Sequence, residues 1–332
     1  MNKIAVFGAG AIGGLLAARL AQSGRQVSVV ARGATLDALQ SKGIVLQEQQ
    51  QGAWQEITQP VRAVADAQQL GVQDVLILSL KAPALPEVLP QLAHLIGPDT
   101  LILAAMNGVP WWFFATPDVP LHGVHLPALD KDGRLSQALP VAQTMGCVVH
   151  LSAACPQPGV VRLAMGNRLI IGEPDGADSA RLAQLAQILR EARFEVDVSH
   201  EIRTQIWYKL WGNMTMNPIS ALTGATGDKI LDDHEVNRFC LDVMAEAAAI
   251  GARIGCPIAQ SGADRMAITR KLGALRTSML QDVEAGKPIE LDALVTVVQQ
   301  IGRELDMPTP YIDVLLGLTR VFAQTRGLYH TA

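Results

Sequence analysis

The first two hundred residues alternate short apolar runs with amphipathic stretches. Nearly continuous apolar runs cover Ile4–Phe7, Val27–Ala31, Asp74–Lys81 and Thr100–Ala105. Runs of this length are typical of strands that are buried on both faces of a parallel sheet. Because Ala11–Ser23, between the first two runs, has helical character, the pattern predicts an α/β domain with a mostly parallel sheet.

Weaker strand signals surround these runs. The polar, glutamine-rich segment 43–64 is typical of peripheral strands or a loop. Beyond residue 146, three short β-rich runs separated by Gly and Pro predict antiparallel edge strands. These runs are Cys147–Leu151, Gly159–Leu163 and Arg168–Glu173. A helix over Ser179–Ala192 and a strand over Phe194–Val198 complete this part of the chain.

The pattern changes after His200, where a period of 3.6 residues replaces the strand signals. It predicts five long helices: Ile202–Met216, His234–Ile254, Ser261–Glu284, Glu290–Leu305 and Pro310–Ala323. We therefore expect two domains, an α/β domain over residues 1–199 and an all-helical domain over residues 200–332. The long apolar helices make a homodimer plausible.

Composition narrows the function classes. The net charge is −4 and no basic run occurs, which argues against a nucleic-acid partner. No apolar run approaches the ~18 residues of a membrane span, and no leader precedes the first strand, so we expect a cytoplasmic protein with no membrane partner. The four cysteines lack zinc spacing, and we expect no metal site.

The turn after the first strand carries a dinucleotide-binding motif, Gly8-Ala9-Gly10-Ala11-Ile12-Gly13. Gly8 permits the tight turn, Gly10 lets the backbone approach a pyrophosphate, and Gly13 lets the helix pack close to the strand. The anion then meets the unpaired N–H groups at the helix N-terminus. The order of strand, turn, helix and second strand favours a dinucleotide site over a purely steric glycine turn.

Two basic residues follow strand ends. Arg32 lies 24 residues after Gly8, where an NAD-binding unit usually offers Asp or Glu to the ribose hydroxyls. A guanidinium suits a 2′-phosphate, so we predict NADPH, with a solvated loop arginine as the alternative. Lys81 ends another strand at the edge where ligands gather, and is either a residue of the cofactor or substrate rim or an ordinary exposed lysine.

Asn107 follows the strand Thr100–Ala105. Its carboxamide could bridge the nicotinamide ribose and the substrate, but Asn-Gly is also a strong turn dipeptide, and both interpretations stay open. The aromatic cluster Trp111–Phe114 favours core packing or a subunit contact over a wall of the substrate pocket.

The helical half carries a polar stripe in an apolar segment. Lys209, Asn213 and Asn217 are spaced four residues apart, so a helix places an ammonium and two carboxamides on one face. Solvated faces usually carry longer charged residues, and Asn is a poor helix former, which favours recognition of a polar ligand. Further on, Ser278 and Glu290 flank a turn at Gly286–Pro288 and could face one cleft. Glu290 could equally complement a helix dipole.

Taken together, these motifs resemble the ketopantoate reductase (2-dehydropantoate 2-reductase) family of the 6-phosphogluconate dehydrogenase-like superfamily. The similar features span nearly the whole chain: the glycine motif, Arg32, Ser79-Leu80-Lys81, Asn107-Gly108, Lys209 with Asn213 and Asn217-Pro218, and Ser278–Asp282 with Glu290. The resemblance implies NADPH-dependent reduction of the small 2-oxo acid 2-dehydropantoate (ketopantoate) to pantoate, a step of pantothenate and coenzyme A biosynthesis.

The resemblance also implies roles for individual residues. Lys209 is the general acid that protonates the ketone oxygen, and Glu290 binds and orients the substrate. Ser278, Asn213 and Asn217 hold the carboxylate and hydroxyl of the substrate. The remaining positions, Lys81 and Asn107, line the cofactor cleft between the domains.

Three features depart from the family pattern. Similar proteins often carry Asn at the position of Leu275, the run 223–227 lacks a further Asn, and the pair Trp111-Trp112 is unusual. These departures leave open a reductase for another branched or aromatic 2-oxo acid. A non-catalytic NADPH-binding sensor is the second alternative, although a sensor needs no proton donor such as Lys209.

Overall fold

Contacts within the chain divide it into two compact units. The computed structural model describes residues 1–50 and 52–329. One unit, which we call the sheet unit, comprises Met1–Met106 and Gly133–Ile202, and the other, the helical unit, comprises Asn107–Asp132 and Arg203–Ala332. The expected boundary after residue 199 lies close to the last crossing between the units. Residues 107–132 belong to the helical unit although they lie inside the range predicted for the α/β domain. We call this segment the excursion, and the hydrophobic pattern did not predict it.

The sheet unit is built on ten strands in the order β4-β3-β9-β8-β7-β6-β1-β2-β5, with β10 paired to β9. The strands are β1 (Lys3–Phe7), β2 (Gln26–Val30), β3 (Ile44–Gln50), β4 (Ala53–Gln59), β5 (Arg62–Val64), β6 (Val75–Leu78), β7 (Leu101–Ala104), β8 (Thr144–Gln157), β9 (Val160–Gly172) and β10 (Glu195–Val198). The central strands β2, β1, β6 and β7 pair in parallel, as predicted. Their buried apolar side chains pack against α1 (Ala11–Gln22) and α5 (Ala180–Glu191) in one core.

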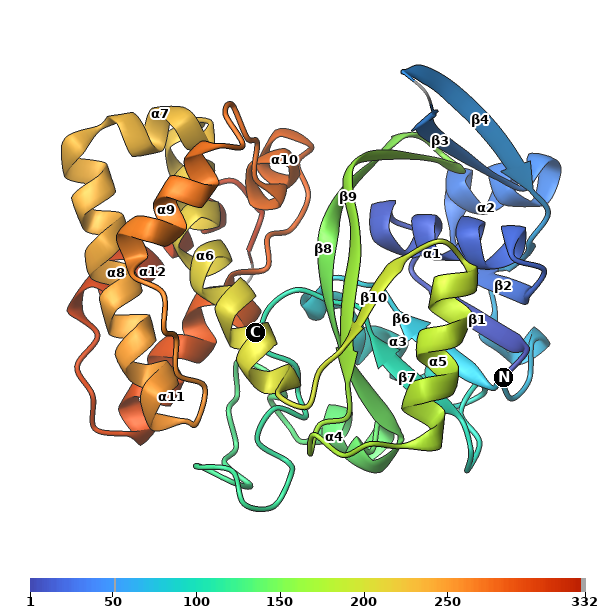
Figure 1. Cartoon of the computed structure of the whole chain (residues 1–332), viewed down its shortest axis with the longest axis horizontal. Coiled ribbons are helices and arrows are strands. Elements are labelled where there is room, and N and C mark those ends of the chain that lie inside the picture. Colours follow the sequence, from blue (N-terminus) through green and yellow to red (C-terminus); the bar gives the residue numbers. More distant parts are fainter. Residues whose placement is uncertain (51, 330–332) are drawn as a thin grey trace. The chain divides into compact units, whose positions relative to one another are not determined.

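The antiparallel part of the sheet differs from the prediction in length and position. Two long strands, β8 and β9, replace the three short runs, and Figure 1 shows them side by side. Gly166, at φ +75°, lets β9 continue where a break was expected, and the register shifts at nearby residues. Both strands lie inside the sheet, between β3 and β7, and β4 is the antiparallel edge strand.

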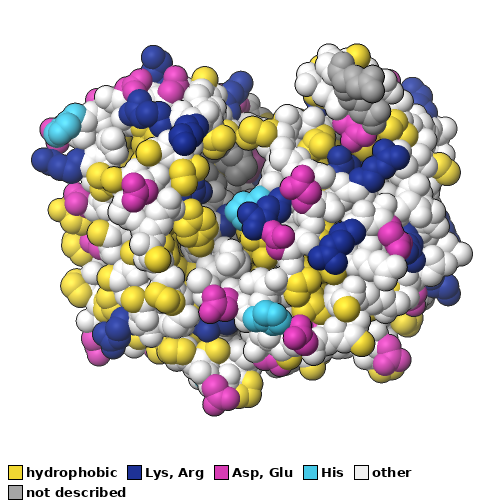
Figure 2. All heavy atoms as spheres, viewed as in Figure 1, with side chains coloured by type: hydrophobic (Ala, Val, Ile, Leu, Met, Phe, Trp, Pro, Cys, Tyr) yellow, Lys and Arg dark blue, Asp and Glu magenta, His cyan; other side chains and the backbone are white. Residues whose placement is uncertain are grey.

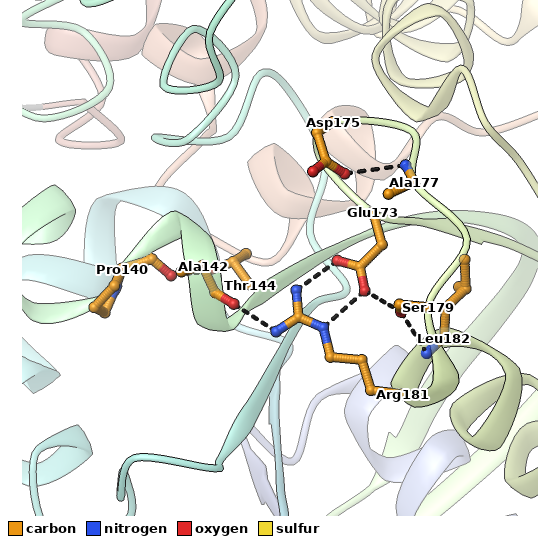
Figure 3. Close-up of polar contacts among 9 residues, drawn as sticks. All are labelled: Pro140, Ala142, Thr144, Glu173, Asp175, Ala177, Ser179, Arg181 and Leu182. Carbon is orange, nitrogen blue, oxygen red and sulfur yellow. Dashed lines mark hydrogen bonds and ion pairs between the residues drawn. The ribbon is translucent and has the colours of Figure 1, made fainter.

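A buried ion pair fastens α5 to the end of β9 (Figure 3). The Glu173 carboxylate is 3% exposed, and it accepts hydrogen bonds from Arg181 Nε at 2.7 Å and from the Ser179 hydroxyl. Ser179 also caps α5, because its Oγ accepts from the N–H of Leu182 at 3.1 Å. The contact with Glu173 raises the pKa of Arg181. A carboxylate this deeply buried is stable only with such partners.

Short helices complete the sheet unit. They are α2 (Gly33–Lys42), α3 (Leu85–Leu92) and α4 (Arg134–Ala138), with the 3-10 turns η1 (Ala67–Gln69), η2 (Ala82–Ala84) and η3 (Val141–Gln143). Helix α2, directly after β2, was not predicted.

No strand occurs among the described residues of the helical unit, which confirms the all-helical prediction. Its elements are α6 (Ile202–Thr223), α7 (Gly227–Asp232), α8 (His234–Arg253), α9 (Gly262–Arg270), α10 (Ser278–Glu284), the π-helical turn η4 (Asp292–Thr296), α11 (Val297–Glu304) and α12 (Pro310–Gln324).

One predicted helix was too long, and another contains a π turn. The single helix predicted over Ser261–Glu284 is two helices, α9 and α10, because Gly273 takes φ +62° and Thr277 has an extended conformation before α10 begins. The helix predicted from Glu290 instead passes through the π turn η4 before α11 begins.

The surface carries both signs of charge. In Figure 2, Lys and Arg side chains stand among Asp and Glu side chains on the face shown. Within residues 1–50 and 52–329, no helix is long and apolar enough to cross a membrane.

Candidate active site

Each glycine of the motif meets a different constraint in the sheet unit. Gly8 has φ +105°, and a Cβ there would lie 2.5 Å from the Ser79 carbonyl oxygen. A Cβ on Gly13 would lie 1.9 Å from the carbonyl oxygen of Gly8, so α1 approaches β1 more closely than any side chain allows. Gly10, at the N-cap of α1, has no protein atom within 4 Å of a Cβ position.

This geometry fits a dinucleotide. Only Gly8 and Gly13 are required by the packing of the protein itself. At Gly10 the backbone is open in front of the α1 N-terminus, and no acidic residue occupies the first turn of α1. An anion can therefore approach the unpaired N–H groups directly.

Parallel pairing brings the predicted cofactor residues to one edge of the sheet. Strand β1 lies between β2 and β6, and Phe7 is in register with both Val30 and Leu78. The three strands end at the same height in the sheet. The glycine turn, Arg32 and Lys81, which come directly after these strands, therefore lie at the same edge of the sheet. The chain order also reverses at β1, and this is where doubly wound sheets bind ligands. Arg32 is exposed at the N-cap of α2 and makes no ion pair with any residue that the structure describes.

Helix α6 is held against α8 by two tryptophans. The indole N–H of Trp207 donates to the Ala247 carbonyl at 3.2 Å, and that of Trp211 donates to the Met244 carbonyl at 2.7 Å. Gly251 makes room for Trp207, since a Cβ there would lie 2.2 Å from the indole nitrogen. These tryptophans were not predicted to have a role, although their spacing of four residues places them opposite the polar stripe.

The polar stripe lies on the other side of α6. Lys209 and Asn213 are half-buried, and Asn217 is 4% exposed. Lys209 Nζ donates to Asn107 Oδ1 at 2.9 Å. Both residues belong to the helical unit, because the excursion of residues 107–132 begins at Asn107.

Ser278 lies beside the far end of this row. Asn217 Nδ2 donates to Ser278 Oγ at 3.4 Å, a long hydrogen bond. Ser278 is the first residue of α10, and Thr277 caps that helix by accepting from the Leu280 N–H at 3.2 Å. The cap fixes the backbone that presents the Ser278 hydroxyl.

Glu290 precedes the π turn η4 in the sequence, and the loop that begins at Asn107 contacts that turn. Glu290 is 8% exposed and lies two residues before the π turn η4. Ala293, inside η4, accepts a hydrogen bond from the Val109 N–H at 3.0 Å. Gly108 takes φ +83°, the chain bends at Asn107-Gly108, and the Asn107 side chain contacts Lys209. Single π turns are frequent at functional sites.

Arg203 was not predicted from the sequence to have a role. Its side chain is 9% exposed, donates from Nε to the Phe113 carbonyl at 2.8 Å and from Nη2 to the Ile254 carbonyl at 3.1 Å, and stacks on the Phe113 ring at 4.7 Å. Burial lowers the pKa of Arg203. The aromatic cluster Trp111–Phe114 is buried, which confirms the core-packing interpretation. Arg203 therefore fastens this part of the excursion to α6 and α8.

Two of the departures from the family pattern are neighbours in the structure. The Gly227 N–H donates to the Leu275 carbonyl at 2.9 Å, and a Cβ on Gly227 would lie 3.5 Å from that of Leu275. Nearby hydroxyls are turned toward their own backbone: Ser220 donates to the Ala225 carbonyl and Thr223 to the Ile219 carbonyl, both at 2.7 Å.

Sequence comparisons find one family. The sequence model described as ketopantoate reductase PanE/ApbA matches residues 4–176, and the model of its C-terminal part matches residues 201–323. A 2-dehydropantoate 2-reductase of Mesorhizobium japonicum is 44% identical over 328 residues, which are 98% of this chain and 99% of that protein.

Solved structures share the fold over almost the whole length. A protein of Ralstonia solanacearum MolK2, described provisionally as a ketopantoate reductase, has a TM-score of 0.94 at 56% identity and covers 99% of both chains. The ketopantoate reductase of Staphylococcus aureus, which is described as dimeric, has a TM-score of 0.74 at 23% identity and covers 98% of this chain and 99% of its own.

The three glycines predict different mutant phenotypes. Gly10→Ala should leave the melting temperature within ~2 °C of the wild type, because no protein atom lies near the new methyl group. It should still weaken dinucleotide binding at least about tenfold in a fluorescence titration, because the methyl group obstructs the anion. Gly13→Ala is the structural control and should lower the melting temperature by ~5 °C or more. Unchanged binding in the Gly10 variant would place the cofactor elsewhere.

Proposed function

The chain belongs to the ketopantoate reductase family, and from that premise we propose that it catalyses the NADPH-dependent reduction of 2-dehydropantoate to pantoate. It is an oxidoreductase, so the family match favours an enzyme over a non-catalytic sensor. The activity would place it in pantothenate and coenzyme A biosynthesis. The observation that carries the proposal is the hydrogen bond between Lys209 and Asn107 at the head of a row of carboxamides.

The proposed chemistry needs one proton donor from the protein. The hydride that reduces the C2 carbonyl is supplied by the bound cofactor. Lys209 Nζ gives its proton to the carbonyl oxygen as the C–O bond becomes single, which forms the 2-hydroxy acid, and the amine regains a proton from solvent. An ammonium next to the carbonyl also stabilises the developing negative charge. Asn107 accepts from Lys209 and so restricts where the ammonium points.

The other predicted site residues of the helical unit are proposed to hold the substrate. Ser278 and Asn217 offer a hydroxyl and a carboxamide to the substrate carboxylate, and their mutual hydrogen bond at 3.4 Å is long enough to be exchanged for a ligand. Asn213, between Lys209 and Asn217 on the helix, is proposed to contact a substrate hydroxyl. Glu290 is proposed to orient the substrate beside Lys209.

A second candidate substrate class follows from the contact between Gly227 and Leu275. These positions supply no polar side chain, and the hydroxyls of Ser220 and Thr223 are already used by the backbone. If Asn213 does not contact a substrate hydroxyl, the site discriminates only weakly for that hydroxyl. A reductase of branched apolar 2-oxo acids is therefore the alternative.

Steady-state kinetics test the proposed reaction. We expect NADPH oxidation with 2-dehydropantoate, and replacing Lys209 with Ala should lower kcat by about 10²–10⁴-fold while NADPH still binds. Lys229, an exposed lysine on α7, provides the matched control, and Lys229→Ala should have normal activity. Near-normal turnover by the Lys209 variant would rule out its role. Faster turnover of a branched 2-oxo acid without the hydroxyl would favour the alternative substrate class.

Arg32 is proposed to select the phosphorylated cofactor. A guanidinium that pairs with a 2′-phosphate contributes ~1.5–3 kcal/mol. Arg32→Ala should therefore lower kcat/KM for NADPH about 10–100-fold and leave kcat/KM for NADH within about twofold. Equal losses with both cofactors would show that Arg32 does not contact the 2′-phosphate.

We also propose that the protein forms a homodimer through α12. Val314, Leu318 and Val321 are 52%, 59% and 60% exposed, and their spacing of four and three residues forms one stripe on that helix. The S. aureus protein shows that this fold is compatible with a dimer. Sedimentation velocity should find a dimer for the wild type and a monomer for Leu318→Glu. A monomeric wild type at micromolar concentration would contradict the proposal.

A further inference from the structure

The last described residues of the chain pack beside the segment that carries Glu290. After α12 the chain turns back, and the Leu328 N–H donates to the Ala323 carbonyl at 2.8 Å. The Leu328 carbonyl then accepts from the Ile289 N–H at 3.0 Å, and the Leu328 side chain is buried. The residue before Glu290 is thus held by the C-terminal tail, far away in the sequence.

Tyr329 makes the second contact of the tail. Its hydroxyl donates to Asp292 Oδ1 at 2.8 Å, and Thr296 Oγ1 donates to the same oxygen at 2.8 Å. Asp292 is the first residue of the π turn and Thr296 is the last, so one carboxylate oxygen joins both ends of η4 to the tail. Burial and the hydrogen bond to Asp292 raise the pKa of Tyr329 to about 12, against the opposing charge of Arg320. The phenol therefore remains a donor throughout the neutral pH range.

The π turn η4 also contacts the loop that carries Asn107. Ala293, the residue after Asp292, accepts from the Val109 N–H at 3.0 Å. A Cβ on Gly108 would lie 2.4 Å from the same carbonyl oxygen, so the loop is in tight contact with the turn. Asn107, one residue earlier, accepts from Lys209 Nζ. A displacement of η4 is therefore transmitted to the partner of Lys209.

We propose that Tyr329 is a positioning residue of the active site: through Asp292 it fixes the π turn against which the Asn107 loop is seated, and so it orients Lys209. The structural role of Tyr329 does not depend on which reaction is catalysed. Its effect on catalysis rests on the proposed function. All of these contacts lie within the helical unit.

Tyr329→Phe tests the proposal because it removes only the hydroxyl. Hydrogen exchange at the Val109 amide should become about tenfold faster, since this amide depends on the position of Ala293. Tyr311→Phe is the matched control: Tyr311 lies on the exposed part of α12 against Phe239, and its hydroxyl makes no hydrogen bond to a described residue. That variant should exchange like the wild type. Unchanged exchange at Val109 in Tyr329→Phe would overturn the proposal.

Kinetics separate positioning from general stability. Tyr329→Phe should lower kcat about 3–10-fold with KM within twofold, because the proton donor is misaligned while the groups that bind the carboxylate are intact. The loss should not add to that of Asn107→Ala in the double variant, because both act on Lys209. Asp292→Asn, which keeps an acceptor oxygen, should retain more activity than Asp292→Ala.

Two results would overturn the catalytic part of the proposal. One is a lower melting temperature with unchanged kcat, which would make Tyr329 purely structural. The other is full additivity of the Tyr329 and Asn107 variants. If the wild-type enzyme reduces no 2-oxo acid, the proposed function fails, whereas the exchange experiment still decides whether Tyr329 holds the Asn107 loop.

Discussion

The helical unit depends on the hydrogen bonds from two indoles on α6 to backbone carbonyls of α8. Trp207 and Trp211 are almost completely buried, so each N–H needs a protein acceptor, and the Ala247 and Met244 carbonyls supply them. Rotating α6 by one residue, about 100°, would turn both indoles away from these acceptors and would turn Lys209 away from Asn107. The tryptophans therefore determine which side of α6 carries the ammonium and the carboxamides.

The excursion after β7 is held by the buried guanidinium of Arg203. Arg203 is desolvated, and its recorded partners are two carbonyl oxygens and the faces of Phe113 and Phe114. Carbonyl dipoles and aromatic rings offset part of the cost of burying a guanidinium. Because the excursion starts at Asn107, its attachment brings that side chain to α6.

At both the glycine turn of the sheet unit and the Lys209 site of the helical unit, a glycine lets two backbone segments come into close contact. In the sheet unit Gly13 lets α1 pack on the turn at Gly8, and in the helical unit Gly108 lets the Asn107 loop pack on Ala293. In each case a methyl group would overlap a carbonyl oxygen. Gly10 is different, since no protein atom lies within 4 Å of a Cβ position there, and the proposed approach of a dinucleotide would account for its lack of a side chain. Glycine is thus required by internal packing at Gly8, Gly13 and Gly108, whereas at Gly10 the packing of the protein does not require it.

The sequence alone determined the local chemistry. Strand, glycine turn and helix are adjacent along the chain, so their periodicity and the motif predicted the cofactor edge, and the four-residue spacing of Lys209, Asn213 and Asn217 predicted one helical face. Some element boundaries were predicted wrongly because a glycine in the sequence does not reveal its effect on the backbone. Gly166 lies within a continuous strand, whereas Gly273 lies where a predicted helix is interrupted, although both have positive φ.

Only the tertiary structure decided which distant residues meet. The pairing of Asn107 with Lys209 spans 102 positions, and that of Tyr329 with Asp292 spans 37. Such contacts form because polar groups that become buried when the helices pack need hydrogen-bond partners. The periodicity of the sequence does not predict which partners they find. The sequence determined which groups could do chemistry, and the packing of α6, η4 and the C-terminal tail determined which of them are held together.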